Sequence, residues 1–173
     1  MRNGIFFILL LMAACKPYED PEPITDPRIN NPYCNDPAAI NFNWGFPGVP
    51  DNSQCFYPAD VFVGNYIWQD STVNDDGVVL TFDSVFATIN KIDSTRFEIT
   101  GRCNADIQLT ASRFLTFFID TVQGDGQIFC RPTDTIIGNG SKIGVSDTTT
   151  FFMNYIVLTD TGTTKHKAKF IKQ

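Results

Sequence analysis

The single histidine is considered first, because nucleophilic catalysis needs a base within hydrogen-bond reach of the attacking group. His166 lies between Lys165 and Lys167 near the end of the chain, a setting that indicates a solvent-exposed strand face. The sequence holds no Gly-x-Ser-x-Gly elbow, no His-Glu-x-x-His pair and no phosphate-binding loop. Two aspartates could still hydrolyse a glycosidic bond if burial raised the pKa of one of them. We therefore predict that the chain is not an enzyme, with an Asp-dependent hydrolase as the alternative.

Oxygen-bearing side chains gather in one short segment between two cysteines, and calcium takes six or more hard oxygen ligands. The weak calcium candidates are Asp36, Asn41, Asn43 and Asp51. The same residue types also cap tight turns, and we favour that interpretation here. No catalytic residue, other metal site or cofactor is predicted.

The N-terminus is typical of an export signal. Residues 1–3 include Arg2, residues 5–12 (IFFILLLM) form an unbroken apolar run, and Ala13, Ala14 and Cys15 follow. The run is much shorter than the roughly 20 residues that span a bilayer, so we do not expect a transmembrane helix. Residues 1–14 are therefore predicted to be a signal peptide.

Residues 11–15 (LMAAC) resemble the lipobox of bacterial lipoproteins, with small residues at the two positions before the cysteine. The resemblance implies a Cys15 that carries a diacylglycerol on its sulfur and a fatty acid such as palmitate on its amine. Two or three acyl chains hold a protein stably on a membrane. The acidic residues Glu19 and Asp20 resemble the export tag of surface lipoproteins in the Bacteroidota. The expected location is the outer membrane, lipid-anchored and either surface-exposed or periplasm-facing; an ordinary signal peptide is the alternative.

Composition narrows the range of partners. The chain has 173 residues, 13 basic and 19 acidic side chains, a formal charge of −6 and a pI of about 4.6. Such a surface repels phosphate backbones, and no basic stripe with interleaved aromatic residues occurs, so nucleic-acid binding is not expected. The membrane is the expected partner, through the lipid anchor.

The cysteine count fits an oxidising compartment. Of the five cysteines, lipidation of Cys15 leaves four, for which two disulfides are the default. Three connectivities are open, and the sequence-local one joins Cys34 to Cys55 and Cys103 to Cys130. A zinc site is the rival, but the chain has no closely spaced cysteine pair and a single histidine.

Two N-terminal segments precede the body of the chain. Residues 15–33 are rich in proline and lack a periodic apolar pattern, which predicts a tether without a stable helix. Residues 34–58 are predicted to form a loop module closed by a disulfide. The sequence CNDPAAINFN, followed by the ending DNSQC, resembles a cysteine-bounded module of exported bacterial proteins with the pattern C-x-D-P-x-A-x-N-[YF]-N…C.

Residues 59–173 have the composition of β-strands, being rich in Ile, Phe, Val, Tyr and Thr. Apolar and polar residues alternate over 95–101 and over 165–170. Turn signals at 75–77, 93–95, 124–126, 138–140 and 160–162 predict hairpins. Further strands are predicted over the runs 61–69, 78–83, 84–92, 105–110, 113–120, 127–131, 141–145 and 148–159.

The prediction is an all-β domain, a small antiparallel meander barrel, with a β-sandwich as the alternative. The Gly64-x-Tyr66 pair in the first strand, and Tyr155 in a late strand followed by a basic last strand, resemble the lipocalin-like domains of small exported lipoproteins.

Two strands, 114–119 and 151–158, are apolar on both faces, so both faces must be covered. A filled barrel is the favoured explanation, and the other is a lumen that holds a small apolar ligand. Wall residues for such a ligand are predicted to be Tyr66, Trp68, Phe118 and Tyr155. The expected function is a lipid-anchored lipoprotein whose barrel binds a small ligand or an envelope protein; a structural envelope protein is the alternative.

Overall fold

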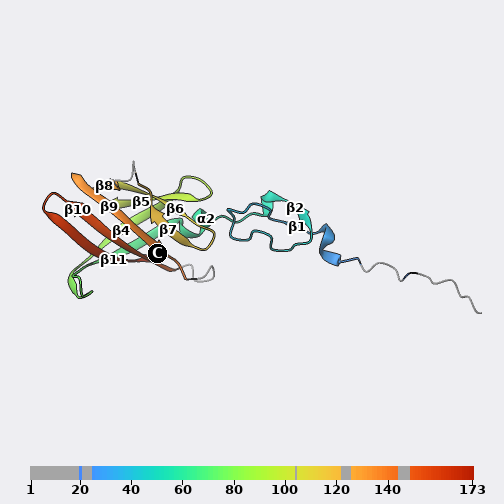
Figure 1. The fold of residues 1–173 in the computed structure, drawn as a ribbon, viewed down its shortest axis with the longest axis horizontal. Coiled ribbons are helices and arrows are strands. Elements are labelled where there is room, and N and C mark those ends of the chain that lie inside the picture. The colour runs from blue at the N-terminus through green and yellow to red at the C-terminus, as the bar shows by residue number, and fades with distance from the viewer. Residues whose placement is uncertain (1–19, 21–24, 104, 122–125, 144–148) are drawn as a thin grey trace, which may run out of the picture.

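The computed structural model describes Asp20 and residues 25–103, 105–121, 126–143 and 149–173. It comprises a small N-terminal module followed by a β-barrel (Figure 1). The module contains the 3-10 helices η1 (Pro27–Asn30) and η2 (Asn52–Gln54) and the strands β1 (Pro32–Tyr33) and β2 (Val49–Pro50). These two strands pair in parallel, so the folded module begins within the segment that was predicted to be a tether.

The barrel follows the short helix α2 (Pro58–Phe62). Its nine strands belong to one sheet. They are β3 (Gly64–Val73), β4 (Val79–Lys91), β5 (Arg96–Arg102), β6 (Ala105–Ala111), β7 (Thr116–Ile119), β8 (Gln127–Phe129), β9 (Arg131–Ser141), β10 (Thr150–Thr159) and β11 (Gly162–Lys172).

The sheet closes into an eight-stranded antiparallel barrel. Each strand from β3 to β6 pairs with the next one along the chain. β9 pairs with β10, β10 pairs with β11, and β11 pairs with β3, which closes the barrel. β7 and β8 pair with successive stretches of the same side of β9, so together they fill one position. The predicted all-β, lipocalin-like barrel is confirmed.

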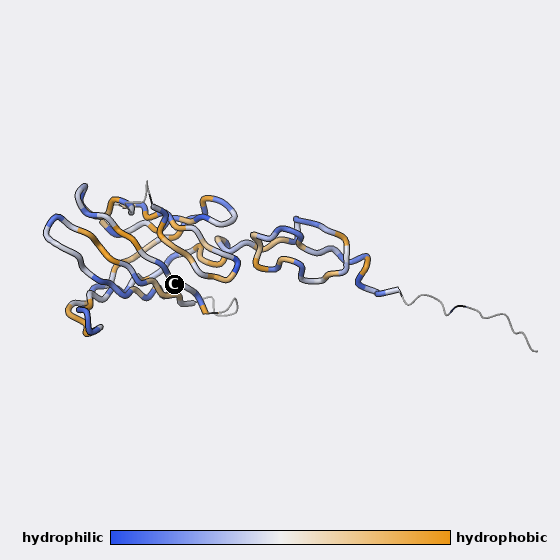
Figure 2. Tube along the Cα trace, viewed as in Figure 1, coloured by the Kyte–Doolittle hydropathy of each residue, from blue (hydrophilic) through white to orange (hydrophobic). Residues whose placement is uncertain are grey.

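Side-chain alternation determines what each strand contributes to the core. In β5, Phe97 and Ile99 are fully buried while Arg96 faces solvent, as the alternation over 95–101 predicts. The tube in Figure 2 shows hydrophobic stretches along the barrel strands. The side chains on one face of the strands therefore form the interior of the barrel.

The end of the barrel next to the module is filled by aromatic rings. Phe62 of α2 is fully buried. Its ring stacks on Phe97 at a centroid distance of 4.9 Å and meets Phe117 and Phe151 edge-on at 5.3 and 5.4 Å. Offset-stacked and edge-on pairs are the favoured geometries of aromatic rings. Here α2 replaces the first part of the strand predicted over 61–69, because Phe62 closes the barrel instead of extending its wall.

The turn predicted at 138–140 is wrong, since these residues lie inside β9. Glycine is needed at 138 and 140 because neighbouring strands approach closely. A Cβ at Gly138 would collide with Tyr155, and one at Gly140 would collide with the ring of Phe117. The break predicted between 83 and 84 is also wrong, because β4 continues through it. The turns at 75–77, 93–95 and 160–162 are confirmed, and 124–126 lies mostly outside the described residues.

Both predicted disulfides are confirmed. Cys34 is bonded to Cys55 within the module, and Cys103 is bonded to Cys130. The second bond ties the turn between β5 and β6 to the junction of β8 and β9. The side-chain oxygen of Gln127 accepts from the backbone N–H of Gln108 at 2.8 Å, and its side-chain nitrogen donates to the carbonyl of Asp120 at 2.7 Å. Gln127 thus bridges β6 and β8, which share no strand ladder among the described residues.

Candidate functional site

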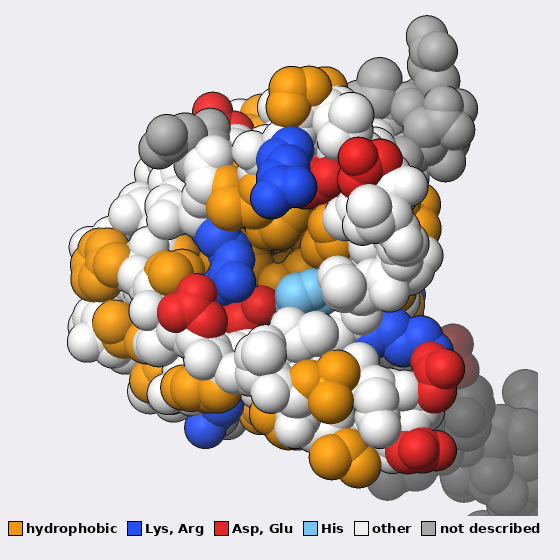
Figure 3. Space-filling model, turned by 90° about the vertical axis from the view of Figure 1, so that its left-hand side faces the viewer, with side chains coloured by type: hydrophobic (Ala, Val, Ile, Leu, Met, Phe, Trp, Pro, Cys, Tyr) orange, Lys and Arg blue, Asp and Glu red, His pale blue; other side chains and the backbone are white. Residues whose placement is uncertain are grey.

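The end of the barrel opposite α2 carries polar side chains that face the interior. Asp70 lies near the end of β3, Arg102 is the last residue of β5, and His166 is close to the start of β11. Because neighbouring strands are antiparallel, these positions meet at the same end of the barrel. Figure 3 looks onto this end and shows a hollow with a hydrophobic floor and with the histidine on its rim.

Asp70 is the centre of this group and is only 3% exposed. Its Oδ2 lies 2.9 Å from Nδ1 of His166 and 3.2 Å from Nη2 of Arg102. The same guanidinium nitrogen is 3.5 Å from Oδ2 of Asp83 on β4. Removal of one partner from a buried ion pair typically costs about 3–5 kcal/mol, because the other charge is left without compensation. The network therefore holds β3, β4, β5 and β11 together at the open end.

His166 uses both ring nitrogens. Its Nε2 lies 2.9 Å from Oγ1 of Thr164, and its ring stacks on Tyr155 at a centroid distance of 4.6 Å. When Nδ1–H donates to Asp70, Nε2 accepts the hydroxyl proton of Thr164 in a hydrogen bond. A carboxylate, an imidazole and a hydroxyl in this order can move a proton from the hydroxyl to the ring. The arrangement also fixes the orientation of the imidazole.

Several buried polar atoms around this network have no hydrogen-bond partner within the described part of the chain. They are Nε1 of Trp68, Oδ1 of Asp70, Nη1 of Arg102 and the hydroxyl oxygen of Tyr155. The hydroxyl of Tyr66 also lacks a partner, but its ring packs against Phe151, nearer the α2 end of the barrel. The guanidinium of Arg102 also lies over the indole of Trp68, at 5.1 Å from the ring centroid. A buried polar group without a partner costs about 1–3 kcal/mol. Such a concentration of unpaired atoms is unusual for the interior of a folded domain.

Two buried tyrosines of the barrel interior have raised pKa values, Tyr155 beside the network and Tyr66 nearer the α2 end. Burial raises the pKa of Tyr66 to about 12. Burial is also the main cause that raises the pKa of Tyr155, and the negative charge of Asp70 adds to it. Both hydroxyls therefore remain protonated at neutral pH and can donate a hydrogen bond.

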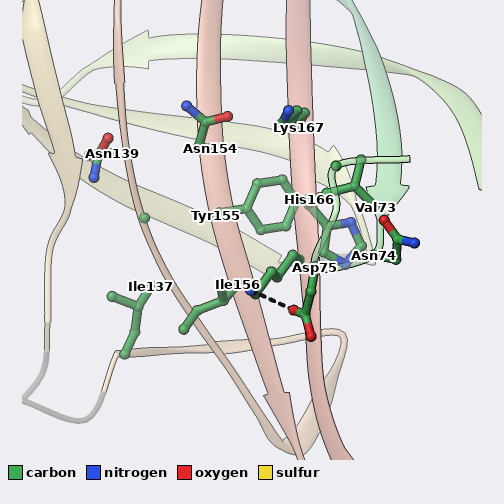
Figure 4. Close-up of a pocket in the computed structure, with 13 residues that line it drawn as sticks. Val73, Asn74, Asp75, Ile137, Asn139, Asn154, Tyr155, Ile156, His166 and Lys167 are labelled. Carbon is green, nitrogen blue, oxygen red and sulfur yellow. Dashed lines mark hydrogen bonds and ion pairs between the residues drawn. The ribbon is translucent and has the colours of Figure 1, made fainter. Parts of the chain in front are cut away.

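A separate groove of about 630 Å³ lies on the outer face of the barrel. Figure 4 shows Asn139, Asn154 and Lys167 along it, from β9, β10 and β11. The turn after β3 closes one side, where Nζ of Lys165 pairs with Oδ1 of Asp75 at 2.7 Å. Tyr155 and His166 lie at the border between this groove and the interior. The side chains that line the groove from outside are exposed or half-buried, so they differ from the buried network within the barrel.

No family model matches this chain, and no curated protein matches it as a relative. Among the described residues, no helix has the length and hydrophobicity needed to cross a membrane.

The predicted wall residues divide into two groups. Tyr66, Trp68 and Tyr155 are buried in the interior, at 1%, 0% and 3% exposure. Phe118 is 55% exposed on the outside of β7, so its predicted position in the wall of the lumen is wrong. In this doubly apolar strand, Phe117 faces the interior, and alternation then directs Phe118 to solvent. The expectation that both faces of the strands over 114–119 and 151–158 are covered is therefore wrong, since Phe114, Phe118 and Phe152 are exposed.

The solvent-exposed setting predicted for His166 is also wrong. Its side chain is 13% exposed and faces the interior. The flanking lysines suggested solvent, but His166 shares its strand face with Ala168 and Phe170, which are buried. The sequence prediction also missed Asp70 and Arg102. Asp70 lies two residues after Trp68 on the same face, which is the signal that could have placed it in the interior.

The calcium candidates serve turns and contacts within the module. Asp36 accepts from the N–H of Ala38 and from the hydroxyl of Tyr57, both at 2.9 Å. Asn41 donates to the carbonyl of Gln54 at 2.7 Å and accepts from the N–H of Phe56 at 2.8 Å. Asp51 accepts from the N–H of Ser53, and Asn43 adopts a positive φ of 59°. The described residues contain no cluster of three or more His, Cys, Asp or Glu side chains suited to a metal.

The predicted signal peptide and lipidation site precede the part of the chain that the structure describes. Cys15 and residues 1–14 lie outside the described residues.

Proposed function

We propose that this chain is a lipid-anchored outer-membrane lipoprotein whose barrel binds a small molecule at its open end. The pattern of residues 1–15 supports the anchor. The observation that carries the binding function is the set of buried, unpartnered polar atoms around Asp70 and Arg102. A structural barrel would be more stable if apolar side chains replaced these groups.

The two ends of the barrel support this assignment differently. At the end near α2, the rings around Phe62 occupy the interior. At the other end, the surface is hollowed and the polar network lies at the rim of the hollow (Figure 3). Small-molecule sites commonly combine apolar walls with a few convergent polar groups. The hollow therefore suits a ligand with an apolar part and one polar head.

The unpartnered atoms define the chemistry of that head. Trp68 Nε1 and Arg102 Nη1 are donors, whereas Asp70 Oδ1 is an acceptor. The head must therefore offer both an acceptor and a donor. Because the charges of Asp70 and Arg102 already compensate each other, a head without net charge loses the least hydration energy on burial. Zwitterionic and neutral polar groups meet this requirement.

Arg102 controls the route to these atoms. None of the unpartnered atoms is in contact with solvent, and the side chain of Arg102 is 16% exposed at the surface of the network. Binding therefore requires the guanidinium to turn outward from the indole of Trp68. Its long side chain can do this while Nη2 exchanges Asp70 for the more exposed Asp83.

Trp68 provides the experiment. The chain has two tryptophans, of which Trp44 is 65% exposed and Trp68 is fully buried. In a Trp44→Phe background, the fluorescence of Trp68 reports on the open end. A panel of small zwitterionic and neutral polar compounds with apolar tails should include one that changes this emission and raises the melting temperature.

Matched variants test the location of the site. We expect Arg102→Met to weaken the response at least about tenfold, a loss typical of one charged hydrogen bond. Arg96→Met is the control, because Arg96 pairs with Asp93 on the exterior at the opposite end of β5. An unchanged emission and melting temperature across the panel, together with exclusion of a fluorescent apolar probe, would favour the purely structural barrel.

A further inference from the structure

Strand β4 has an edge that is only partly paired. It runs from Val79 to Lys91 and pairs with β3 along most of this length. Its ladder with β5 covers only Thr88 to Lys91. Gly101 of β5 still lies against the backbone of Phe86 and Ala87. The part from Val79 to Val85 therefore presents backbone donors and acceptors on the side away from β3. In Figure 1, the hairpin of β3 and β4 reaches beyond the rest of the barrel at the lower left.

This open edge is hydrophobic and exposed. Every residue from Val79 to Ser84 is exposed to solvent. The large apolar side chains Val79, Leu80, Phe82 and Phe86 are between 56% and 62% exposed. The folded chain therefore leaves both the strand edge and its side chains uncovered.

The edge carries little of the usual protection against pairing, apart from one bulge at Leu80, where the register against β3 shifts. Natural edge strands commonly carry lysines, prolines or inward-pointing charges that oppose another strand. Between Val79 and Ala87 the sequence has no proline and one charged residue, Asp83. The carboxylate of Asp83 lies 3.5 Å from Arg102 of the same molecule, which compensates its charge. An incoming apolar strand therefore meets little electrostatic opposition.

We propose that this edge binds the same edge of a second copy of the chain, as an antiparallel pair about a two-fold axis. A free edge selects an extended strand, since only such a partner satisfies a row of backbone groups. Each copy carries this edge, and a two-fold interface uses the same surface on both molecules. The dimer would join the two barrel walls into one continuous sheet.

The sequence of β4 favours one register. An axis at Phe82 places Phe82 opposite Phe82 of the second copy, within the part of β4 that follows the bulge at Leu80. Asp83 then lies opposite the hydroxyl-bearing Thr81. An axis at Asp83 would instead oppose two carboxylates, which destabilises a strand pair. Aromatic and β-branched cross-strand pairs stabilise the first register.

Cysteine cross-linking of the full chain tests the contact and its register. In Phe82→Cys, the new thiols of two copies lie directly opposite each other, so mild oxidation should give a covalent dimer on a non-reducing gel. Wild type shows how much covalent dimer the native cysteines form on their own. Phe118→Cys is the matched control, because Phe118 is 55% exposed on β7, whose ladders pair it with both β6 and β9.

Sedimentation equilibrium of the full chain supplies an independent measurement. Wild type and Phe118→Lys should dimerise as concentration rises, whereas Phe82→Lys should remain monomeric. Phe82 is 62% exposed, so its replacement leaves the core intact, which near-UV circular dichroism can verify. A wild type that stays monomeric up to about 1 mM, where even weak specific pairs associate, would overturn the proposal. Equal cross-linking of Phe82→Cys and Phe118→Cys would also overturn it.

Discussion

Replacement of Tyr66 by phenylalanine should make the protein more stable. The Tyr66 hydroxyl is buried without a hydrogen-bond partner among the described residues. Burial of an unpaired hydroxyl costs about 1–3 kcal/mol in proteins. The phenylalanine ring keeps the edge-on contacts with Phe151 and Phe170, whose centroids lie at 5.3 and 6.4 Å. We therefore expect Tyr66→Phe to raise the free energy of unfolding at pH 7 by about 1–3 kcal/mol.

The same substitution should change the response to alkaline pH. Burial raises the pKa of Tyr66 from 10.0 to about 12. Between these values the unfolded chain has lost a proton that the folded chain still binds, so stability decreases as pH rises. One such group contributes a slope of about 1.4 kcal/mol per pH unit. This decrease in stability should be absent below pH 10. Above pH 10, the slope should be smaller in Tyr66→Phe than in wild type by about 1.4 kcal/mol per pH unit. Tyr155, whose pKa is also raised, contributes to the remaining slope in the same direction.

Urea unfolding followed by fluorescence at pH 7, 10 and 11 measures both effects. Tyr57→Phe is the contrasting variant, because its hydroxyl donates to Asp36 at 2.9 Å. Its loss should reduce stability by about 0.5–1.5 kcal/mol. A decrease in stability of Tyr66→Phe at pH 7 would refute the reasoning, since it would mean that the hydroxyl has a favourable partner in solution.

Two further substitutions test the barrel closure and the anchor. Phe62→Ala should lower the free energy of unfolding by about 3–5 kcal/mol, because it leaves a cavity among Phe97, Phe117 and Phe151; a loss below about 1 kcal/mol in chemical unfolding would contradict this role of α2. Cys15→Ser should move the protein from the membrane to the soluble fraction after cell lysis, because no acyl chain could be attached; equal membrane association of the variant would argue against lipidation.

Local sequence patterns predicted those features of the barrel that a few neighbouring residues determine. Alternation placed Phe97 and Ile99 in the core before any pairing was known. The sequence-local disulfides were predictable because each joins cysteines at the ends of one compact segment. The turns at 75–77 and 160–162 carry the glycines that hairpins commonly require, and both were found.

Features that depend on distant neighbours were not predictable from local patterns. Gly138 and Gly140 indicate a turn by their type, but they accommodate Tyr155 and Phe117 from other strands. The partners of Asp70 are Arg102 and His166, which only barrel closure brings to the same end. The uneven pairing of β4 likewise depends on where β5 ends. Tertiary packing thus overrode local preference both near the candidate site and at the aromatic end of the barrel.

The second disulfide lies next to the polar network of the open end. Cys103 directly follows Arg102, and its bond to Cys130 restrains the turn that carries the guanidinium. A disulfide across 27 residues stabilises a fold by about 3–4 kcal/mol in the chain-entropy model. A few unpaired polar atoms at about 1–3 kcal/mol each destabilise this end by a similar amount. In the free energy of unfolding of the whole domain, the covalent bond therefore offsets the cost of the unpaired polar atoms at the mouth of the barrel.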